Sequence, residues 1–126
     1  DLDHFKRVND TYGHEAGDFV LQEMTRLIRT ELLAPRDIFA RYGGEEFAIL
    51  LSNTSGARAL ELAERIRAAV EAHAFLYEGT RLPVTCSMGV AGPHLGIDSA
   101  ATLLKAADMA GYASKRNGRN RVTMAD

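Results

Sequence analysis

An α+β fold, with helices packed against a mixed and largely antiparallel sheet, is predicted from the order of elements along this sequence. Segments with apolar residues at helical spacing alternate with short apolar runs of strand length, and turns rich in glycine and proline separate them. The chain has 126 residues, of which 46% are hydrophobic and 25% are charged, as in an ordinary soluble globular protein. This length indicates one domain with a proper core.

A polar segment and a long helix are predicted before the first strand. Phe5 and Val8 indicate one turn of helix within the polar residues 1–15. The long helix is expected to open at Gly17-Asp18, with the Asp18 carboxylate as its N-cap, and to end at Pro35. Its core-facing residues recur at helical spacing: Val20, Met24, Leu27, Ile28 and Leu32.

A hairpin is predicted around Gly43-Gly44, with strands at residues 38–42 and 47–51. Paired glycines suit a tight two-residue turn because both positions tolerate positive φ. The run 47–51 is apolar without alternation, which indicates a strand covered on both faces. Glu45 and Glu46 follow the glycines, and strand neighbours point to opposite faces, so different roles are expected for their carboxylates. Taken alone, these residues equally suit a turn with two solvated glutamates.

The second half of the chain predicts two further helices and several short strands. A hydroxyl N-cap in the loop 53–56 is expected to begin a helix over residues 57–73. The buried stripe of that helix is predicted to be Leu60, Ala63, Ile66 or Arg67, and Val70. The remaining predicted elements are a small hairpin (75–77 and 80–83), a half-buried strand (84–91), a loop (92–97), a helix (99–117) stopped by Gly118, and a last strand (121–124).

Composition excludes several classes of protein. A net charge of −2 argues against a nucleic-acid binder that relies on a general positive field. The single cysteine, Cys86, permits no internal disulfide and fits a reducing compartment. The sequence shows no signal peptide and no apolar run of membrane-spanning length, so a cytoplasmic location is expected, alone or as the cytoplasmic part of a membrane-anchored protein.

Three motifs point to a family. Asp1-Leu2-Asp3-His4-Phe5-Lys6 opens the chain, Gly43-Gly44-Glu45-Glu46-Phe47 forms the predicted turn, and Tyr112-Ala113-Ser114-Lys115-Arg116-Asn117-Gly118-Arg119-Asn120 closes the last helix. Together they closely resemble the motifs of the GGDEF-domain diguanylate cyclases, which condense two GTP into cyclic di-GMP. The resemblance implies the split βαβ, ferredoxin-like architecture of nucleotide cyclases. In that architecture, a first strand and the helix before it would lie upstream of Asp1.

Residues 1–126 are therefore expected to form a GGDEF catalytic domain that is incomplete at its N-terminus. We expect a sensory or regulatory segment upstream in a longer protein, and instability of residues 1–126 alone, because a missing central strand exposes edges and core.

The chemistry of joining two nucleotides requires hard divalent cations, which bridge phosphate oxygens and lower the pKa of the attacking hydroxyl. The resemblance implies two Mg²⁺ or Mn²⁺ ions per GTP, held by Asp1, the Leu2 carbonyl, Glu45 and Glu46. It also implies that Glu45 is the base for the 3′-hydroxyl. Asp3 is expected beside the metal site rather than in it. Without the resemblance, Asp1 suits a solvated chain terminus.

Phosphate and guanine contacts are also implied by the resemblance. The implied phosphate ligands are Lys6, Lys115, Arg119 and the backbone amides around His4 and Phe5. Taken alone, Lys115 and Arg119 suit the C-terminal dipole of a helix better than a phosphate site. Ser114 stands where the family typically has alanine. Asn9 and Asp18 match the residues that read guanine, and an Asp acceptor favours GTP over ATP. Gly43 and Gly44 have no Cβ, so substrate can approach the backbone there.

One family feature is altered. Many relatives carry R-x-x-D before the glycine pair as a product-binding inhibitory site. Asp37 occupies the Asp position, but Ala34 replaces the arginine, and Arg36 is expected to point elsewhere. Alanine cannot replace an arginine fork, so weak or absent product inhibition is predicted. Arg65 matches a further product-contacting arginine, or is simply part of a solvated helix face.

Three functions are compatible with the sequence. The first is a diguanylate cyclase in which two protomers face one another, each holding GTP. The second is a catalytically silent GTP-binding module that regulates an attached partner. The motif acids, glycines and lysines are all present, which favours catalysis. The third, a ferredoxin-like RNA binder, lacks the aromatic and basic strand of such proteins.

Overall fold

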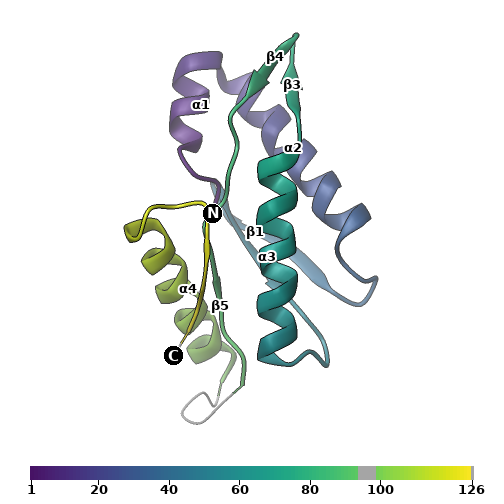
Figure 1. Cartoon of the computed structure of the whole chain (residues 1–126), viewed down its shortest axis with the longest axis vertical. Helices are drawn as coiled ribbons and strands as arrows, with labels where there is room; N and C mark the ends of the chain where they lie inside the picture. Colours follow the sequence, from purple (N-terminus) through teal and green to yellow (C-terminus); the bar gives the residue numbers. More distant parts are fainter. Residues whose placement is uncertain (94–98, 126) are drawn as a thin grey trace.

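The computed structural model describes residues 1–93 and 99–125, so most of the predicted loop 92–97 lies outside the described residues. Figure 1 shows the elements in order along the chain. They are α1 (Phe5–Tyr12), α2 (His14–Glu31), β1 (Ile38–Gly43), β2 (Glu46–Leu50), α3 (Gly56–Ala72), β3 (Phe75–Tyr77), β4 (Thr80–Leu82), β5 (Met88–Val90), α4 (Ala100–Arg116) and β6 (Val122–Met124). The α+β class is confirmed.

The described strands pair two by two. β1–β2 and β3–β4 are antiparallel, and β5–β6 is parallel. The N-terminal residues connect two of these pairs: Leu2 forms an antiparallel bridge with Cys86, and its N–H donates to the carbonyl of Glu45 at 3.2 Å. Residues 1–3 therefore lie between the β1–β2 turn and the segment that leads into β5, near the centre of the molecule (Figure 1).

The core is built from the apolar stripes of α2 and α3 together with residues of the strands and of the N-terminal segment. In α3 the alternative is settled, because Ile66 is buried and Arg67 is not part of the apolar stripe. Leu60, predicted to be buried, is 36% exposed. The buried members of the core are Leu2, Val8, Ala16, Val20, Leu21, Met24, Leu27, Ile28, Phe39, Ile66, Val70, Phe75, Leu82, Val84 and Cys86.

The start of α2 differs from the prediction. The helix begins at His14, directly after Gly13, whose φ of 96° is not helical and separates α2 from α1. Asp18 therefore lies in the second turn, and its predicted role as N-cap is wrong. α1 is also a full helix of 8 residues rather than a single turn. The hydroxyl N-cap predicted in the loop 53–56 is present as Ser55, which accepts from the N–H of Arg58. Ser99, predicted as the first residue of the last helix, is its N-cap instead and accepts from the N–H of Thr102.

The hairpin turn is shifted by one residue from the prediction. Gly43 pairs with Glu46, so the turn consists of Gly44 and Glu45, and only Gly44 has positive φ, at 21°. An irregularity between Arg41 and Gly43 inserts Tyr42 as an extra residue in β1. The run 47–51 is not fully covered in this structure, since Leu50 is 56% exposed. β5 is also shorter than the predicted strand 84–91, because only residues 88–90 pair with β6.

Within residues 1–93 and 99–125, no helix is both long and apolar enough to cross a lipid bilayer. Cys86 is a free, buried thiol.

Candidate functional site

Two of the predicted motifs meet at residues 1–3. The N–H of Leu2 donates to the carbonyl of Glu45, which places the start of the chain against the β1–β2 turn. The carbonyl of Asp1 accepts from the N–H of Ser87 at 2.9 Å, so the same segment is held on its other side. Glu45 is half-buried in the turn, whereas Glu46 begins β2 and is exposed. The two carboxylates therefore lie in different environments, although Glu45 is in the turn and not, as predicted, a strand neighbour of Glu46.

The third motif reaches the same place through an ion pair. Nζ of Lys115, in the last turn of α4, pairs with Oδ2 of Asp1. The side chains of Lys115 and Asp1 are 32% and 19% exposed, so both remain accessible from solvent. Three segments that are far apart in the sequence therefore converge around Asp1.

The residues predicted to hold a hard divalent cation are Asp1, Glu45 and Glu46, through carboxylate oxygens, and Leu2, through its carbonyl. The structure joins their main chains through the bond from the N–H of Leu2 to the carbonyl of Glu45. In the described part of the chain, no three His, Cys, Asp or Glu side chains are grouped as a ready-made cage. Mg²⁺ accepts such a sparse set, because it prefers one or two carboxylates together with substrate oxygens.

The first turn of α1 holds several predicted phosphate ligands. His4 has φ 55° in the left-handed region and forms the N-cap of α1 without a side-chain bond. Phe5 and Lys6 follow as the first helical residues, and Lys6 is exposed. Amides in the first turn of a helix have no acceptor within the helix, which suits an anion.

The predicted guanine-reading residues lie where α1 and α2 pack together. Gly17 is buried at this contact, and a Cβ there would overlap Oδ1 of Asn9. The close approach thus seats the Asn9 side chain on α2, one residue from Asp18. Asp18 is exposed, so its carboxylate is free of the core.

At the end of α4, Ser114 explains the departure from the family pattern. Its hydroxyl is buried, donates to the carbonyl of Met88 at 2.8 Å and shares a hydrogen bond with Oγ1 of Thr123 at 2.6 Å. Ser114 therefore ties α4 to β5 and β6, and its carbonyl also accepts from the N–H of Arg119 at 2.9 Å. Arg119 itself is exposed, with φ 65°.

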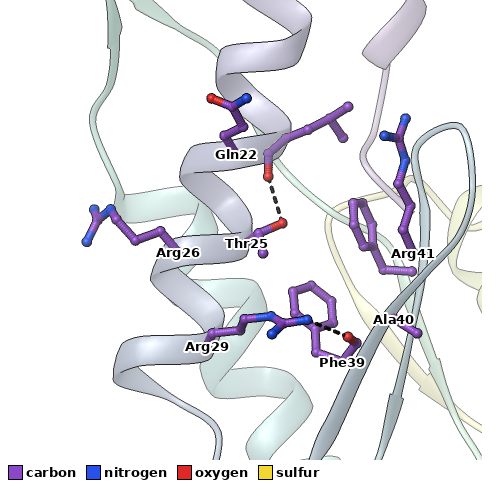
Figure 2. A pocket seen from close by; sticks show the side chains of 9 residues that line it. Gln22, Thr25, Arg26, Arg29, Phe39, Ala40 and Arg41 are labelled. Atoms are coloured by element: carbon purple, nitrogen blue, oxygen red, sulfur yellow. Dashed lines mark hydrogen bonds between the residues drawn. The ribbon is translucent and has the colours of Figure 1, made fainter.

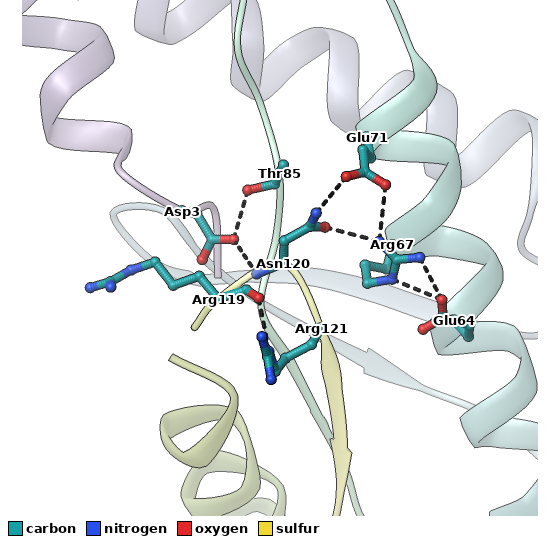
Figure 3. A network of polar contacts seen from close by, with 8 residues as sticks. All are labelled: Asp3, Glu64, Arg67, Glu71, Thr85, Arg119, Asn120 and Arg121. Carbon is teal, nitrogen blue, oxygen red and sulfur yellow. Dashed lines mark hydrogen bonds and ion pairs between the residues drawn. The ribbon is translucent and has the colours of Figure 1, made fainter. Parts of the chain in front are cut away.

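A polar network that no sequence pattern indicated lies beside these residues (Figure 3). Asp3 is 6% exposed and accepts from Thr85 at 2.8 Å, from Ser87 at 2.6 Å and from the N–H of Asn120 at 3.0 Å. The amide side chain of Asn120 continues the network to Arg67 and Glu71 on α3.

These contacts shift the pKa values of the α3 side chains. The hydrogen bond from Asn120, followed by the one from Arg67, lowers the pKa of Glu71. The hydrogen bond from Arg67 lowers the pKa of Glu64, and Glu64 in turn raises the pKa of Arg67.

A separate pocket of about 400 Å³ lies between α2 and β1 (Figure 2). Arg26, Arg29 and Arg41 line it together with apolar residues, and Arg29 donates to the carbonyl of Phe39 at 2.9 Å. Arg41 belongs to the strand before the turn, and its Nε donates to the carbonyl of Gly44 at 2.8 Å. The predicted metal and phosphate ligands do not line this pocket.

A small hollow of about 170 Å³ lies at the altered R-x-x-D positions, where Ala34, Asp37 and Arg29 help to line it. Oδ2 of Asp37 accepts from the N–H of Ala34 at 2.9 Å, so the local turn already uses this carboxylate. Arg65 lies exposed on α3.

Comparison with known proteins gives concordant matches. Diguanylate cyclase A of Treponema denticola is 48% identical over 124 residues, which are 98% of this chain and 33% of that protein. The structure resembles the active GGEEF domain of a diguanylate cyclase from Vibrio cholerae, with a TM-score of 0.89, 37% identity and coverage of 100% and 79% of the two chains. It also resembles the coiled coil and GGDEF domain of DgcB from Caulobacter crescentus in complex with c-di-GMP, with a TM-score of 0.90, 38% identity and coverage of 99% and 66%.

The chain spans about a third of the length of the Treponema relative. Residues 1–121 match the family model described as "Diguanylate cyclase, GGDEF domain". This match covers almost the whole chain, and the motifs that converge on Asp1 all lie within it. The chain therefore belongs to the GGDEF family of diguanylate cyclase domains.

Proposed function

We propose that this chain is the catalytic domain of a diguanylate cyclase, which condenses two GTP into cyclic di-GMP and releases two pyrophosphates. The observation that carries the proposal is the convergence at residues 1–3, where Leu2 bonds to the turn at Glu45 and Asp1 pairs with Lys115. It supports a site in which Asp1 and Glu45 would serve a cation and a base, with Lys115 beside them as a partner for a triphosphate. The alternative, a silent GTP-binding module, has no observation in its favour.

GGDEF diguanylate cyclases are metal-dependent, and for this chain we propose two Mg²⁺ or Mn²⁺ ions per GTP. The proposed ligands are the carboxylates of Asp1, Glu45 and Glu46 and the carbonyl of Leu2. Bound there, the ions would neutralise phosphate charge and lower the pKa of the 3′-hydroxyl.

Glu45 is proposed to take the proton from the 3′-hydroxyl of its own GTP. The freed oxygen then forms a bond to the α-phosphorus of the GTP on the partner protomer, and the bond from that phosphorus to pyrophosphate breaks. The same step in the opposite direction closes the ring. A homodimer is therefore part of the proposed mechanism, since each protomer holds only one of the two nucleotides.

The triphosphate is proposed to lie between Lys6, Lys115, Arg119 and the amides around His4 and Phe5. Lys115 and Asp1 pair with each other in this structure, so substrate binding requires them to exchange partners. Lys115 then turns to phosphate, and Asp1 is released for the cation. Asn9 and Asp18 are proposed to accept hydrogen bonds from guanine, while Gly43 and Gly44 leave room for the substrate.

The domain is proposed to act in the cytoplasm, where GTP is found, alone or within a membrane-anchored protein. An N-terminal segment is proposed to control activity by bringing two domains together. The DgcB structure provides a parallel, because it includes a coiled coil beside its GGDEF domain.

The test is to hold the full-length protein as a dimer, incubate it with GTP and Mg²⁺, and measure pyrophosphate release and the nucleotide product. We expect cyclic di-GMP from the wild type and a fall of about 100-fold or more for Glu45→Gln, since a general base contributes about that much. Glu61→Gln, an exposed change on α3, is the matched control and should keep full activity. GTP binding without turnover in the enforced wild-type dimer would contradict the proposal and favour the silent module.

A further inference from the structure

The loop that carries Arg119 is in an unusual conformation. Gly118, Arg119 and Asn120 follow α4 with φ values of 122°, 65° and 47°. Glycine and asparagine tolerate this left-handed region, but an arginine there is strained. Such strain persists only where the surroundings hold the backbone in place.

Asn120 provides that support through its backbone N–H and both polar atoms of its side chain. Its N–H donates to Oδ2 of Asp3 at 3.0 Å, its Oδ1 accepts from Arg67 at 3.0 Å, and its Nδ2 donates to Glu71 at 2.5 Å (Figure 3). Asp3 lies in the N-terminal motif, whereas Arg67 and Glu71 lie on α3. One residue therefore fastens the loop to two other parts of the molecule.

Both anchors are themselves well fixed. The carboxylate of Asp3 is buried and also accepts from Thr85 and Ser87. The guanidinium of Arg67, with a side chain 17% exposed, bonds to Glu64 through Nε and Nη2 and to Glu71 through Nη1. A loop tied to two fixed anchors has little freedom, so the position of Arg119 is set before any ligand arrives.

We propose that Asn120 is a positioning residue for the triphosphate site, which holds Arg119 in place through Asp3 on one side and through Arg67 and Glu71 on the other. This inference rests on the proposed function, because Arg119 is placed there as a phosphate ligand. Asn120 does not touch the substrate itself. Its effect on the affinity for GTP must therefore pass through Arg119. Substitution of the surface residues of α3 that hold Asn120 should then alter the affinity for GTP as well.

The first experiment compares two exposed glutamates on α3 that both bond to Arg67. Only Glu71 also bonds to Asn120, so Glu64 provides the matched control. The measurement is the equilibrium affinity of the full-length protein for a non-hydrolysable GTP analogue, with the melting temperature recorded alongside. We expect Glu71→Ala to weaken binding by about fivefold and Glu64→Ala to change it by less than about twofold. Equal effects of the two changes would overturn the inference.

The second experiment is a double-mutant cycle. Asn120→Gly removes the amide side chain but keeps a residue that tolerates positive φ. We expect Asn120→Gly and Arg119→Ala each to weaken binding by about tenfold, and the double variant to be no weaker than Arg119→Ala alone. Unchanged affinity in Asn120→Gly, or a loss of about 100-fold in the double variant, would overturn the positioning role. A wild type that does not bind the analogue would instead contradict the proposed function, and the inference with it.

Discussion

Burial raises the pKa of the Cys86 thiol to about 11, from an ordinary value of 9.0. The sulfur lies in the core, where a thiolate would lose its hydration, so the folded state favours the protonated form. Below about pH 9 the thiol is protonated in both the folded and the unfolded states. Above that pH the unfolded state releases the proton first, and stability is lost as the pH rises towards about 11.

Between pH 8 and 10.5 we expect the free energy of unfolding to fall more for the wild type than for Cys86→Ala. The difference between the two falls should be at most about 3 kcal/mol. Chemical denaturation of both proteins at several pH values measures this difference. If the free energies of unfolding of the two proteins changed in parallel with pH, the pKa of the thiol would be the same in the folded and unfolded states, and the prediction would be wrong. Cys86→Ala will also be less stable than wild type at neutral pH because of the lost packing, but that offset does not depend on pH.

A second prediction at this scale concerns product inhibition. Asp37 bonds to the N–H of Ala34, and alanine offers no donor fork to a phosphate or a guanine. We expect Asp37→Ala to leave the affinity for cyclic di-GMP within about twofold of wild type, because the site lacks its arginine. Ala34→Arg should restore the R-x-x-D pattern and tighten product binding by about tenfold or more. Calorimetric titration measures both, and a tight wild-type affinity that Asp37→Ala abolishes would show the prediction to be wrong.

At the scale of elements, β5 and α4 pack backbone to backbone. A Cβ at Gly89 would overlap the carbonyl oxygen of Ala107 and the amide nitrogen of Gly111, and neither atom can move without shifting the helix. A Cβ at Gly111, on the other side of the same contact, would lie at an ordinary distance of 3.5 Å from the nitrogen of Gly89.

We therefore expect Gly89→Ala to lower the free energy of unfolding by about 3 kcal/mol, through overpacking. Gly111→Ala is the matched control and should stay within about 1 kcal/mol of wild type, since alanine is the better helix former. Thermal and chemical denaturation distinguish the two. Similar losses in both variants would mean that β5 and α4 do not pack as described.

The elements that the sequence predicted well are those with local signals. Apolar spacing located α2 and α3, and the hydroxyl-bearing loop 53–56 located the start of α3. The range 99–117 predicted for α4 is correct to within one residue at each end. The start of α2 was missed because Gly13 alone separates it from α1, and the polar residues there give no apolar period. The position of the hairpin turn depends on the strand register, which an extra residue at Tyr42 shifts.

The motifs of the site could be predicted from the sequence, but the hydrogen bonds that hold these motifs in place could not. The convergence on Asp1 followed from the resemblance, and the structure joins the same segments. The contact from Asn120 to Asp3 spans 117 residues of sequence, and the one from Arg67 to Asn120 spans 53. Neither contact produces a periodic or local pattern in the sequence, so these residues can be identified as partners only in the folded structure.

At the scale of the whole molecule, the net charge of −2 contrasts with the placed cation of Lys115, which pairs with Asp1. If the proposed function holds, a triphosphate would be attracted by a few placed cations rather than by a general positive field. The ion pair with Asp1 also gives the Lys115 ammonium group a partner before substrate binds. Affinity for GTP should accordingly depend on the individual cations more than on the overall charge of the protein.

The proposed mechanism needs two working protomers, because each must activate its own hydroxyl against the nucleotide of the other. A mixed dimer with one Glu45→Gln protomer can form only one of the two bonds, so it should stop at a linear dinucleotide that still carries a triphosphate. When wild type and Glu45→Gln are mixed equally at random, about one quarter of the dimers are fully wild type. Cyclic di-GMP formation should then fall to about one quarter of the wild-type rate at the same total protein, and the linear product should accumulate.

Chromatography of the nucleotides after mixing, under conditions where protomers exchange, measures both products. Mixing with Glu61→Gln should leave the rate unchanged and controls for dilution. A fall to about one half, without a linear product, would instead mean that each protomer completes the reaction alone. That result would remove the homodimer from the mechanism, and control by an upstream segment would then have to act within a single domain.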